Sequence, residues 1–84
     1  MDFDPAKDVV NIAKHGMSLA RAHELDLRFA MIDDRADYGE TRFIGYGLLD
    51  SRPCYLVFTL RDGVVRPISL RRAHSREYRR HVPL

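Results

Sequence analysis

The chain has 84 residues, of which 45% are hydrophobic and 31% are charged, and its formal net charge is +2. A chain of this length forms one domain, here residues 1–84, with a thin core that leaves no room for a deep cofactor cavity. No apolar run approaches the roughly 20 residues that span a bilayer, and the acidic start MDFDPAKD does not resemble a secretory signal. We therefore expect a cytoplasmic globular domain without membrane attachment and without a cofactor.

The first predicted element is a helix over residues 5–15. Asp4 is a suitable N-cap, Pro5 suits the first helical position, and Gly16 can adopt the left-handed conformation that ends a helix. The apolar residues of this stretch recur at helical spacing and predict a core-facing side, formed by Val9, Val10, Ile12 and Ala13. Ser18 can cap a second helix over the next nine residues.

Four strand candidates follow, at residues 29–32, 42–49, 54–61 and 64–71. A polar, acidic loop over Asp33–Glu40 separates the first two strands. A four-residue turn, Asp50–Pro53, precedes the third strand, and the two-residue hairpin signal Asp62-Gly63 precedes the fourth. The strands are therefore expected to form an antiparallel meander, and Pro67 indicates that the last strand lies at an edge.

Side-chain alternation predicts which residues of the last strand face the core. Three apolar residues are expected to point inward, namely Val64, Ile68 and Leu70. Ser75 can cap a final short helix, in which Glu77 is spaced to pair with Arg80. The predicted fold class is α+β, with two N-terminal helices, a four-stranded antiparallel meander sheet and a short C-terminal helix.

The charge is unevenly distributed along the chain. Residues 61–84 hold seven arginines against two acidic residues, a net charge of +5, whereas the first sixty residues carry −3. Because arginine grips phosphate oxygens in pairs, an RNA or DNA backbone is the simplest polyanion to propose. Alternation predicts a phosphate-sized cradle on the open sheet face, formed by Thr59, Arg61, Ser69 and Arg71. The same arginines would also suit a solvated face or surface ion pairs.

Four stretches of the chain form a recognisable series. They are F-D-P-A-K at residues 3–7, N-x-x-K-H-G at 11–16, Arg42-Phe43 followed by Gly45 or Gly47, and I-S-L-R-R-A with R-E-Y within 68–78. In this order and spacing they resemble the BrnT family of bacterial toxins. The resemblance implies a RelE-like fold and a ribonuclease that arrests translation. It also implies three partners: RNA, a cognate BrnA-like antitoxin with a ribbon-helix-helix part, and operator DNA bound through that antitoxin.

Cleavage of RNA without a metal ion requires a base, an acid and cations that stabilise the phosphorane charge. Arginine cannot act as the base, because its pKa lies above about 12 and its guanidinium group keeps its proton at neutral pH. The candidate catalytic residues are Arg71, Glu77 and His74. The candidate nucleic-acid-binding residues are Arg61, Arg72, Arg76, Arg42, Lys14 and His15. The choice of base and acid stays open among Glu77, His74, His15 and Lys14, and the scattered histidines predict no metal site.

Two other functions fit the same residues. A non-catalytic nucleic-acid-binding module needs only arginines that hold phosphates, and an interaction subunit needs only a basic face for an acidic partner. RNA that stays intact in EDTA would favour either alternative over a ribonuclease. An antitoxin could add a strand to the meander or occlude a cleft, and the sequence leaves both modes open.

Overall fold

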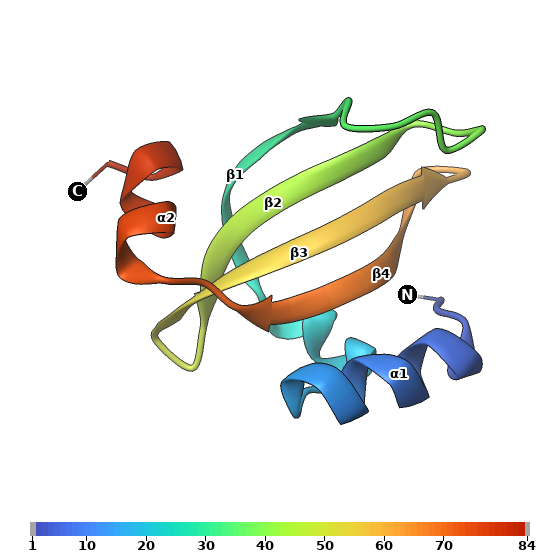
Figure 1. The fold of residues 1–84 in the computed structure, drawn as a ribbon, viewed down its shortest axis with the longest axis horizontal. Helices are drawn as coiled ribbons and strands as arrows, with labels where there is room; N and C mark the ends of the chain where they lie inside the picture. The colour runs from blue at the N-terminus through green and yellow to red at the C-terminus, as the bar shows by residue number, and fades with distance from the viewer. Residues whose placement is uncertain (1, 84) are drawn as a thin grey trace.

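The computed structural model describes residues 2–83. In chain order its elements are α1 (Pro5–His15), the 3-10 helix η1 (Leu19–Glu24), β1 (Asp26–Asp33), β2 (Arg42–Leu49), β3 (Arg52–Arg61), β4 (Val64–Arg72) and α2 (Ser75–His81). The strands form one antiparallel sheet in the order β1-β2-β3-β4. In Figure 1, α1 runs beside β4 and α2 lies at one end of the sheet. The α+β class, the meander and the C-terminal helix are confirmed.

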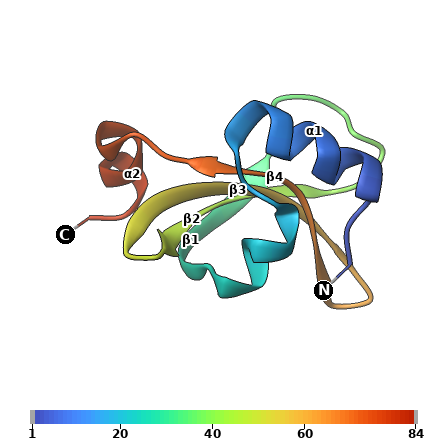
Figure 2. The ribbon, with the colours of Figure 1, turned by 90° about the horizontal axis from the view of Figure 1, so that it is seen from below.

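The sheet carries a hydrophobic cluster on each face, because its strands alternate their side chains. On one face, side chains of β3 pack with buried residues that precede β1, namely Met17, Leu19 and Ala22. On the other face, Tyr55 and Val57 of β3 pack with Tyr78 of α2. We call these the η1 face, after the helix that supplies Leu19 and Ala22, and the α2 face. Figure 2 shows α1 and α2 at different positions along the sheet. No helix within residues 2–83 is long and apolar enough to span a bilayer.

Helix α1 has the predicted bounds, but its sheet-facing side differs from the prediction. Asp4 accepts a hydrogen bond from the Ala6 amide at 2.9 Å, and Gly16 ends the helix with φ 69°. The expected core residues are instead exposed, with Val9 at 69%, Val10 at 51% and Ile12 at 47% exposure. The prediction that this apolar side faces the core is therefore wrong.

The residue of α1 that is buried against the sheet is Asn11. Its Nδ2 donates to the carbonyl oxygens of Met17 at 2.8 Å and Leu70 at 2.9 Å, and its Oδ1 accepts from the Leu70 amide at 3.1 Å. An edge strand presents unpaired backbone donors and acceptors, and a carboxamide can satisfy both kinds. Asn11 therefore takes the place that a neighbouring strand would occupy beside β4.

The second predicted helix is shorter than expected and is a 3-10 helix of six residues. Ser18 caps it as predicted, with its hydroxyl accepting from a backbone amide at 3.1 Å. Its apolar residues recur every three positions, at Leu19, Ala22 and Leu25. That spacing matches the three residues per turn of a 3-10 helix rather than the 3.6 of an α-helix. The 3-10 helix ends at Glu24, and β1 begins at Asp26, three residues before the predicted strand start.

The turns between β2 and β3 and between β3 and β4 have two residues each. Asp62 and Gly63 have φ angles of 52° and 77°, as expected for the primed turns that suit the twist of a hairpin. Asp50 and Ser51 also have positive φ angles, 52° and 62°. The predicted four-residue turn before β3 is therefore wrong, and β3 begins at Arg52.

A bulge in β4 shifts the side-chain alternation of that strand. The pairing of β3 with β4 is displaced by one position, which leaves Ile68 as an extra residue. Val64 and Ile68 therefore lie on the α2 face, and only Leu70 of the three predicted inward residues packs in the η1-face cluster. The neighbouring Pro67 lacks an amide hydrogen, which favours an irregular ladder at this point.

The two edges of the sheet are protected differently. β4 is an edge strand, as Pro67 indicated, and Asn11 occupies its outer backbone groups at Leu70. β1 is the other edge strand, and its residues Asp26–Ala30 are all exposed. One edge is thus capped by a side chain, whereas the other is open.

Candidate functional site

Arg71 lies near the end of β4 with its side chain on the α2 face, as predicted. Its cross-strand partner is Tyr55, and the guanidinium carbon lies 4.0 Å from the centroid of that ring. This is a cation–π contact, which fixes the plane of the guanidinium group. The side chain remains 30% exposed, so a ligand on the sheet surface can reach it.

Glu77 pairs with Arg71, and the predicted pairing with Arg80 is not formed. Arg71 Nη1 donates to Oε1 at 3.1 Å and Nη2 donates to Oε2 at 3.0 Å, which makes a bidentate ion pair. The Tyr46 hydroxyl of β2 donates to Oε2 at 3.3 Å. These three side chains, which we call the Arg71–Glu77–Tyr46 network, tie α2 to two strands of the sheet.

The network has a defined charge state at neutral pH. The hydrogen bonds from Arg71 lower the pKa of the Glu77 carboxyl below its usual range. Burial, together with the nearby Glu77 charge, raises the pKa of Tyr46 to about 12. The hydrogen bonds to Glu77 raise the pKa of Arg71. The site therefore contains an ionised carboxylate, a protonated phenol and a charged guanidinium group.

An aromatic stack of Phe29, Tyr46 and His81 borders the network. Sequence reasoning did not identify His81 as part of it. His81 of α2 stacks on Tyr46 with ring centroids 4.7 Å apart and an interplanar angle of 12°. It also stacks on Phe29 of β1, the cross-strand partner of Tyr46, at 5.5 Å and 27°. His81 follows Glu77 by four residues, which places both on one side of a helix. That spacing was the available signal, although sequence reasoning assigned His81 no functional role.

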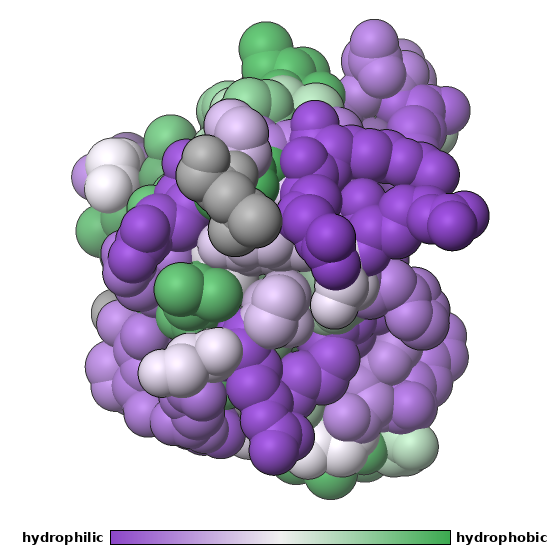
Figure 3. All heavy atoms as spheres, turned by 90° about the vertical axis from the view of Figure 1, so that its left-hand side faces the viewer, coloured by the Kyte–Doolittle hydropathy of each residue, from purple (hydrophilic) through white to green (hydrophobic). Residues whose placement is uncertain are grey.

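Helix α2 also presents a group of arginines to the surface. Arg76, Arg79 and Arg80 surround a hollow of about 410 Å³. Figure 3 faces the end of the molecule that carries α2 and shows hydrophilic side chains gathered over it. Within residues 2–83, none of the three arginines forms an ion pair.

His74 lies at the start of the same helix. It occupies the N-cap position that was predicted for Ser75, and its side chain makes no capping hydrogen bond. Its backbone carbonyl accepts from the Tyr78 amide at 2.9 Å, which begins the helix. The imidazole of His74 is exposed and lies one helical turn before Glu77.

Two predicted phosphate ligands lie apart from Arg71. Arg72 points to the opposite face, as alternation predicted, and donates to the Leu49 carbonyl at 3.2 Å. Arg61 lies on the α2 face but six residues along β3 from the partner of Arg71, a separation of about 20 Å. It pairs with Glu40 at 3.7 Å. The predicted four-residue cradle is therefore not formed, because alternation assigns a face but not a position along the strand.

The remaining candidates lie outside the network. Arg42 lies four residues before Tyr46 on β2, about 13 Å away along the strand, with its guanidinium carbon 4.1 Å from the Tyr38 ring centroid. Lys14 and His15 occupy the last turn of α1, where a positive charge complements the helix dipole.

A second polar cluster lies at the far end of the α2 face. Asp33, predicted to lie in a solvated loop, is buried at the end of β1. Arg35 donates to its two carboxylate oxygens at 2.7 and 2.8 Å, and the Tyr38 hydroxyl donates at 3.2 Å. The prediction of a fully solvated acidic loop is wrong here, because the aspartate gains charge-assisted hydrogen bonds as it loses water.

Replacing Asp33 with asparagine is expected to remove an acid-sensitive part of the stability. Hydrogen bonds from Arg35 hold the pKa of Asp33 well below its usual value of about 3.9. In acid the unfolded chain therefore binds more protons than the native protein, so this stabilisation is complete above about pH 5 and is lost progressively as the pH falls from about 4 toward the lowered pKa of the folded protein. Urea unfolding at pH 3 to 7 should show a smaller pH dependence for Asp33→Asn than for the wild type. Asp34→Asn, at the exposed neighbour, is the control, and equal pH dependence in wild type and Asp33→Asn would contradict the argument.

The α2 face therefore combines an oriented guanidinium group, a carboxylate, an exposed imidazole and arginines without ion-pair partners in the described chain. This set can hold a phosphodiester and exchange protons with it. Within residues 2–83, no three His, Cys, Asp or Glu side chains are placed to bind a metal ion.

Comparison with known proteins gives one match. The model of a family described as "Ribonuclease toxin, BrnT, of type II toxin-antitoxin system" matches residues 3–77. The matched range includes Arg71, His74 and Glu77 and ends before the last four residues of α2. Comparisons with curated proteins and with solved structures gave no match.

Proposed function

Because the chain belongs to the BrnT family of ribonuclease toxins of type II toxin–antitoxin systems, we propose that it cleaves RNA without a metal ion at the Arg71–Glu77–Tyr46 network. Family membership supplies RNA as the substrate and an antitoxin as the partner. The observation that carries the proposed site is the orientation of Arg71. Its guanidinium group is held between the Tyr55 ring and the Glu77 carboxylate while part of it remains exposed.

The proposed reaction is a transesterification. The ribose 2′-oxygen attacks the adjacent phosphorus, the bond to the 5′-oxygen breaks, and the products carry a 2′,3′-cyclic phosphate and a 5′-hydroxyl. A base takes the proton of the 2′-hydroxyl, and an acid protonates the departing 5′-oxygen. Arg71 stabilises the negative charge that develops on the phosphorane, and its fixed position means that little reorganisation accompanies that charge.

We assign proton transfer to His74 and the orientation of Arg71 to Glu77. A carboxylate whose pKa is lowered is a weak base, because general bases act best with a pKa near the working pH. An imidazole can accept or donate a proton near neutral pH, and that of His74 is exposed one turn before Glu77. Glu77 is then a positioning residue, whereas His74 contacts the RNA.

The arginines of α2 extend the proposed RNA-binding surface beyond the reacting phosphate. Arg76, Arg79 and Arg80 surround their hollow on the same helix that contributes Glu77. Contacts of arginine with successive phosphates hold a strand without reading its sequence. We therefore propose that these three side chains bind phosphates flanking the cleaved bond.

We further propose that the antitoxin is a BrnA-like protein with a ribbon-helix-helix part, through which the complex binds operator DNA. The site of action would be the cytoplasm, where messenger RNA is translated. These proposals rest on the family resemblance, and the RelE-like fold that it implies likewise stays a prediction.

Purified protein is expected to cleave RNA in the presence of EDTA and to leave 2′,3′-cyclic phosphate ends, because the proposed reaction uses side chains alone. End-labelled RNA resolved on gels and mass spectrometry of the fragments measure both results. A preparation made identically from cells without the gene controls for contaminating nucleases. Cleavage that stops in EDTA and returns with added Mg²⁺ would contradict the proposal.

A non-catalytic RNA-binding module is the second candidate, and one observation favours it. The Arg71 charge is balanced by Glu77, whereas the arginines of α2 form no ion pair within the described chain. Such a module would bind RNA with a strong dependence on salt concentration. Bound RNA that remains intact through long incubation would support this function over the ribonuclease.

A further inference from the structure

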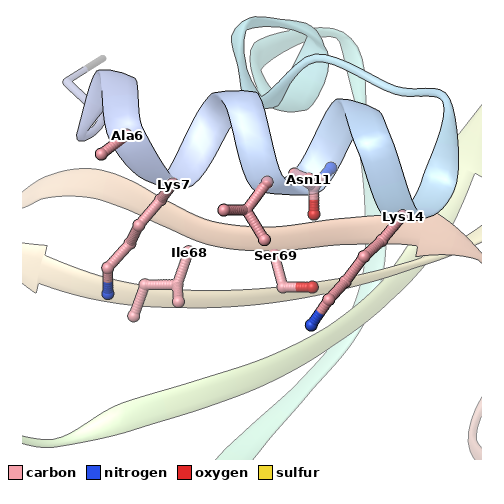
Figure 4. Close-up of a pocket in the computed structure, with 7 residues that line it drawn as sticks. Ala6, Lys7, Asn11, Lys14, Ile68 and Ser69 are labelled. Carbon is pink, nitrogen blue, oxygen red and sulfur yellow. The ribbon is translucent and has the colours of Figure 1, made fainter.

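A groove of about 380 Å³ runs between α1 and β4, outside the proposed site. Ala6 and Val10 of α1 and Ile68 of β4 give it an apolar lining. Figure 4 shows the side chains of Lys7 and Lys14 extending from α1 past β4, on either side of Ile68. The two lysines are two helical turns apart, about 10 Å. The groove is therefore apolar at its centre and cationic at both ends.

The charges of this groove are not balanced within the described chain. Neither lysine forms an ion pair within residues 2–83. No acidic residue lines the groove in that part of the chain. The acidic residue that follows Lys7 in α1 is engaged elsewhere, because Asp8 accepts hydrogen bonds from the Ser18 hydroxyl at 3.0 Å and the Leu19 amide at 2.7 Å. A ligand with carboxylates on both sides of an apolar centre would complement the groove.

The backbone at the groove disfavours an added strand. Asn11 already occupies the amide and carbonyl of Leu70. Pro67 has no amide hydrogen, and Ile68 forms the bulge. An incoming strand would therefore find no continuous set of hydrogen-bonding partners. A helix satisfies its own backbone and needs only side-chain contacts, so it suits this groove better. The apolar lining likewise suits a protein better than an RNA backbone.

We infer that the α1–β4 groove binds an acidic amphipathic helix of the antitoxin. The inference rests on the proposed function, because only a toxin has an antitoxin to bind. Apolar side chains of the helix pack on Val10 and Ile68, and carboxylates about two turns apart pair with the two lysines. Ser69 also lines the groove and precedes Arg71 by two residues, about 7 Å along β4. A helix bound here ends beside the Arg71–Glu77–Tyr46 network and keeps RNA away from it.

The test is the double variant Lys7→Glu/Val10→Asp. Both positions are exposed, so the variant is expected to fold. Its matched control is Val9→Asp/Arg52→Glu, which makes the same charge change on the adjacent helix position and at the start of β3, outside the groove. Calorimetry with the antitoxin encoded beside the toxin gene should show at least a 100-fold loss of affinity for the double variant and none for the control. Both variants should cleave RNA like the wild type.

The other outcomes overturn the inference in distinguishable ways. Unchanged antitoxin affinity in an RNA-cleaving double variant shows that the groove is not the antitoxin site and leaves the proposed function intact. Lost RNA cleavage with unchanged antitoxin affinity assigns the groove to RNA. A wild-type dimer that becomes monomeric in the double variant assigns it to a second copy of the chain. A wild-type protein that neither cleaves RNA nor arrests growth overturns the proposed function itself.

Discussion

Arg71→Ala is expected to slow RNA cleavage by about 10²- to 10³-fold, the usual effect of removing one fixed donor to a developing oxyanion. Expression of the variant should no longer arrest growth. The loss arises in the chemical step, because Arg71 is oriented by Tyr55 and Glu77 toward the surface where the phosphate would lie. Single-turnover cleavage of labelled RNA measures the rate separately from binding, and growth after induction measures toxicity.

The same substitution should leave the fold intact. Arg71 is 30% exposed, so solvent screens its ion pair with Glu77 and can hydrate the carboxylate that the substitution leaves unpaired. Arg71→Lys should recover only part of the rate, because an ammonium group keeps the charge but not the planar fork. Glu77→Gln should lower the rate without removing the pH dependence if Glu77 positions Arg71, whereas loss of that dependence would make Glu77 the base. Full activity of a folded Arg71→Ala protein would rule out the site.

Asn11→Ala is expected to produce the largest loss of stability. The substitution removes three hydrogen bonds at a side chain that is only 4% exposed and leaves two backbone groups of Leu70 and one of Met17 unpaired. Each unpaired buried group costs about 1 to 3 kcal/mol, so a total near 3 kcal/mol is expected after partial hydration. For a domain of this size that corresponds to a fall in melting temperature of roughly 12 to 24 °C.

Thermal and urea unfolding followed by circular dichroism measure this effect. Ile12→Ala is the matched control, because it truncates the next residue of the same helix at a 47% exposed position. Surface substitutions of that kind usually change the free energy of unfolding by less than about 0.5 kcal/mol. An Asn11→Ala protein as stable as the Ile12→Ala protein would show that the carboxamide does not hold α1 to the sheet.

The sequence predicted those features that depend on local chemistry. Asp4, Pro5 and Gly16 fixed both ends of α1, and Asp62-Gly63 fixed the turn between β3 and β4. Each of these signals acts through the residue's own backbone preference or through a hydrogen bond within two residues. Such preferences do not depend on which distant segments of the chain pack against these residues.

The sequence-based predictions failed where a buried polar contact decides which side chains are buried. The apolar side of α1 was expected to be buried, but the sheet edge at Leu70 selects the carboxamide of Asn11, which is 59 residues away in the chain. Asp33 was expected to be solvated, but Arg35 and Tyr38 fold back onto it. In both cases a buried polar contact, which periodicity does not detect, overrides the hydrophobic pattern.

The candidate site was predicted in part. Alternation placed Arg71 and Arg72 on opposite faces correctly, and the structure also brings Glu77 to Arg71. Arg61 was grouped with Arg71 because both share a face, although about six residues of strand separate them. The contribution of Tyr46 could not be inferred, because it depends on how α2 packs across β2.

The unequal edges of the sheet set a limit on self-association. Copies of the chain that met through their exposed β1 strands could extend one sheet across a two-fold axis. The outermost strand on each side of such a pair would then be β4, whose Leu70 groups are already taken by Asn11. An added strand would have to displace that amide side chain at Leu70, so backbone pairing beyond such a pair would be hindered.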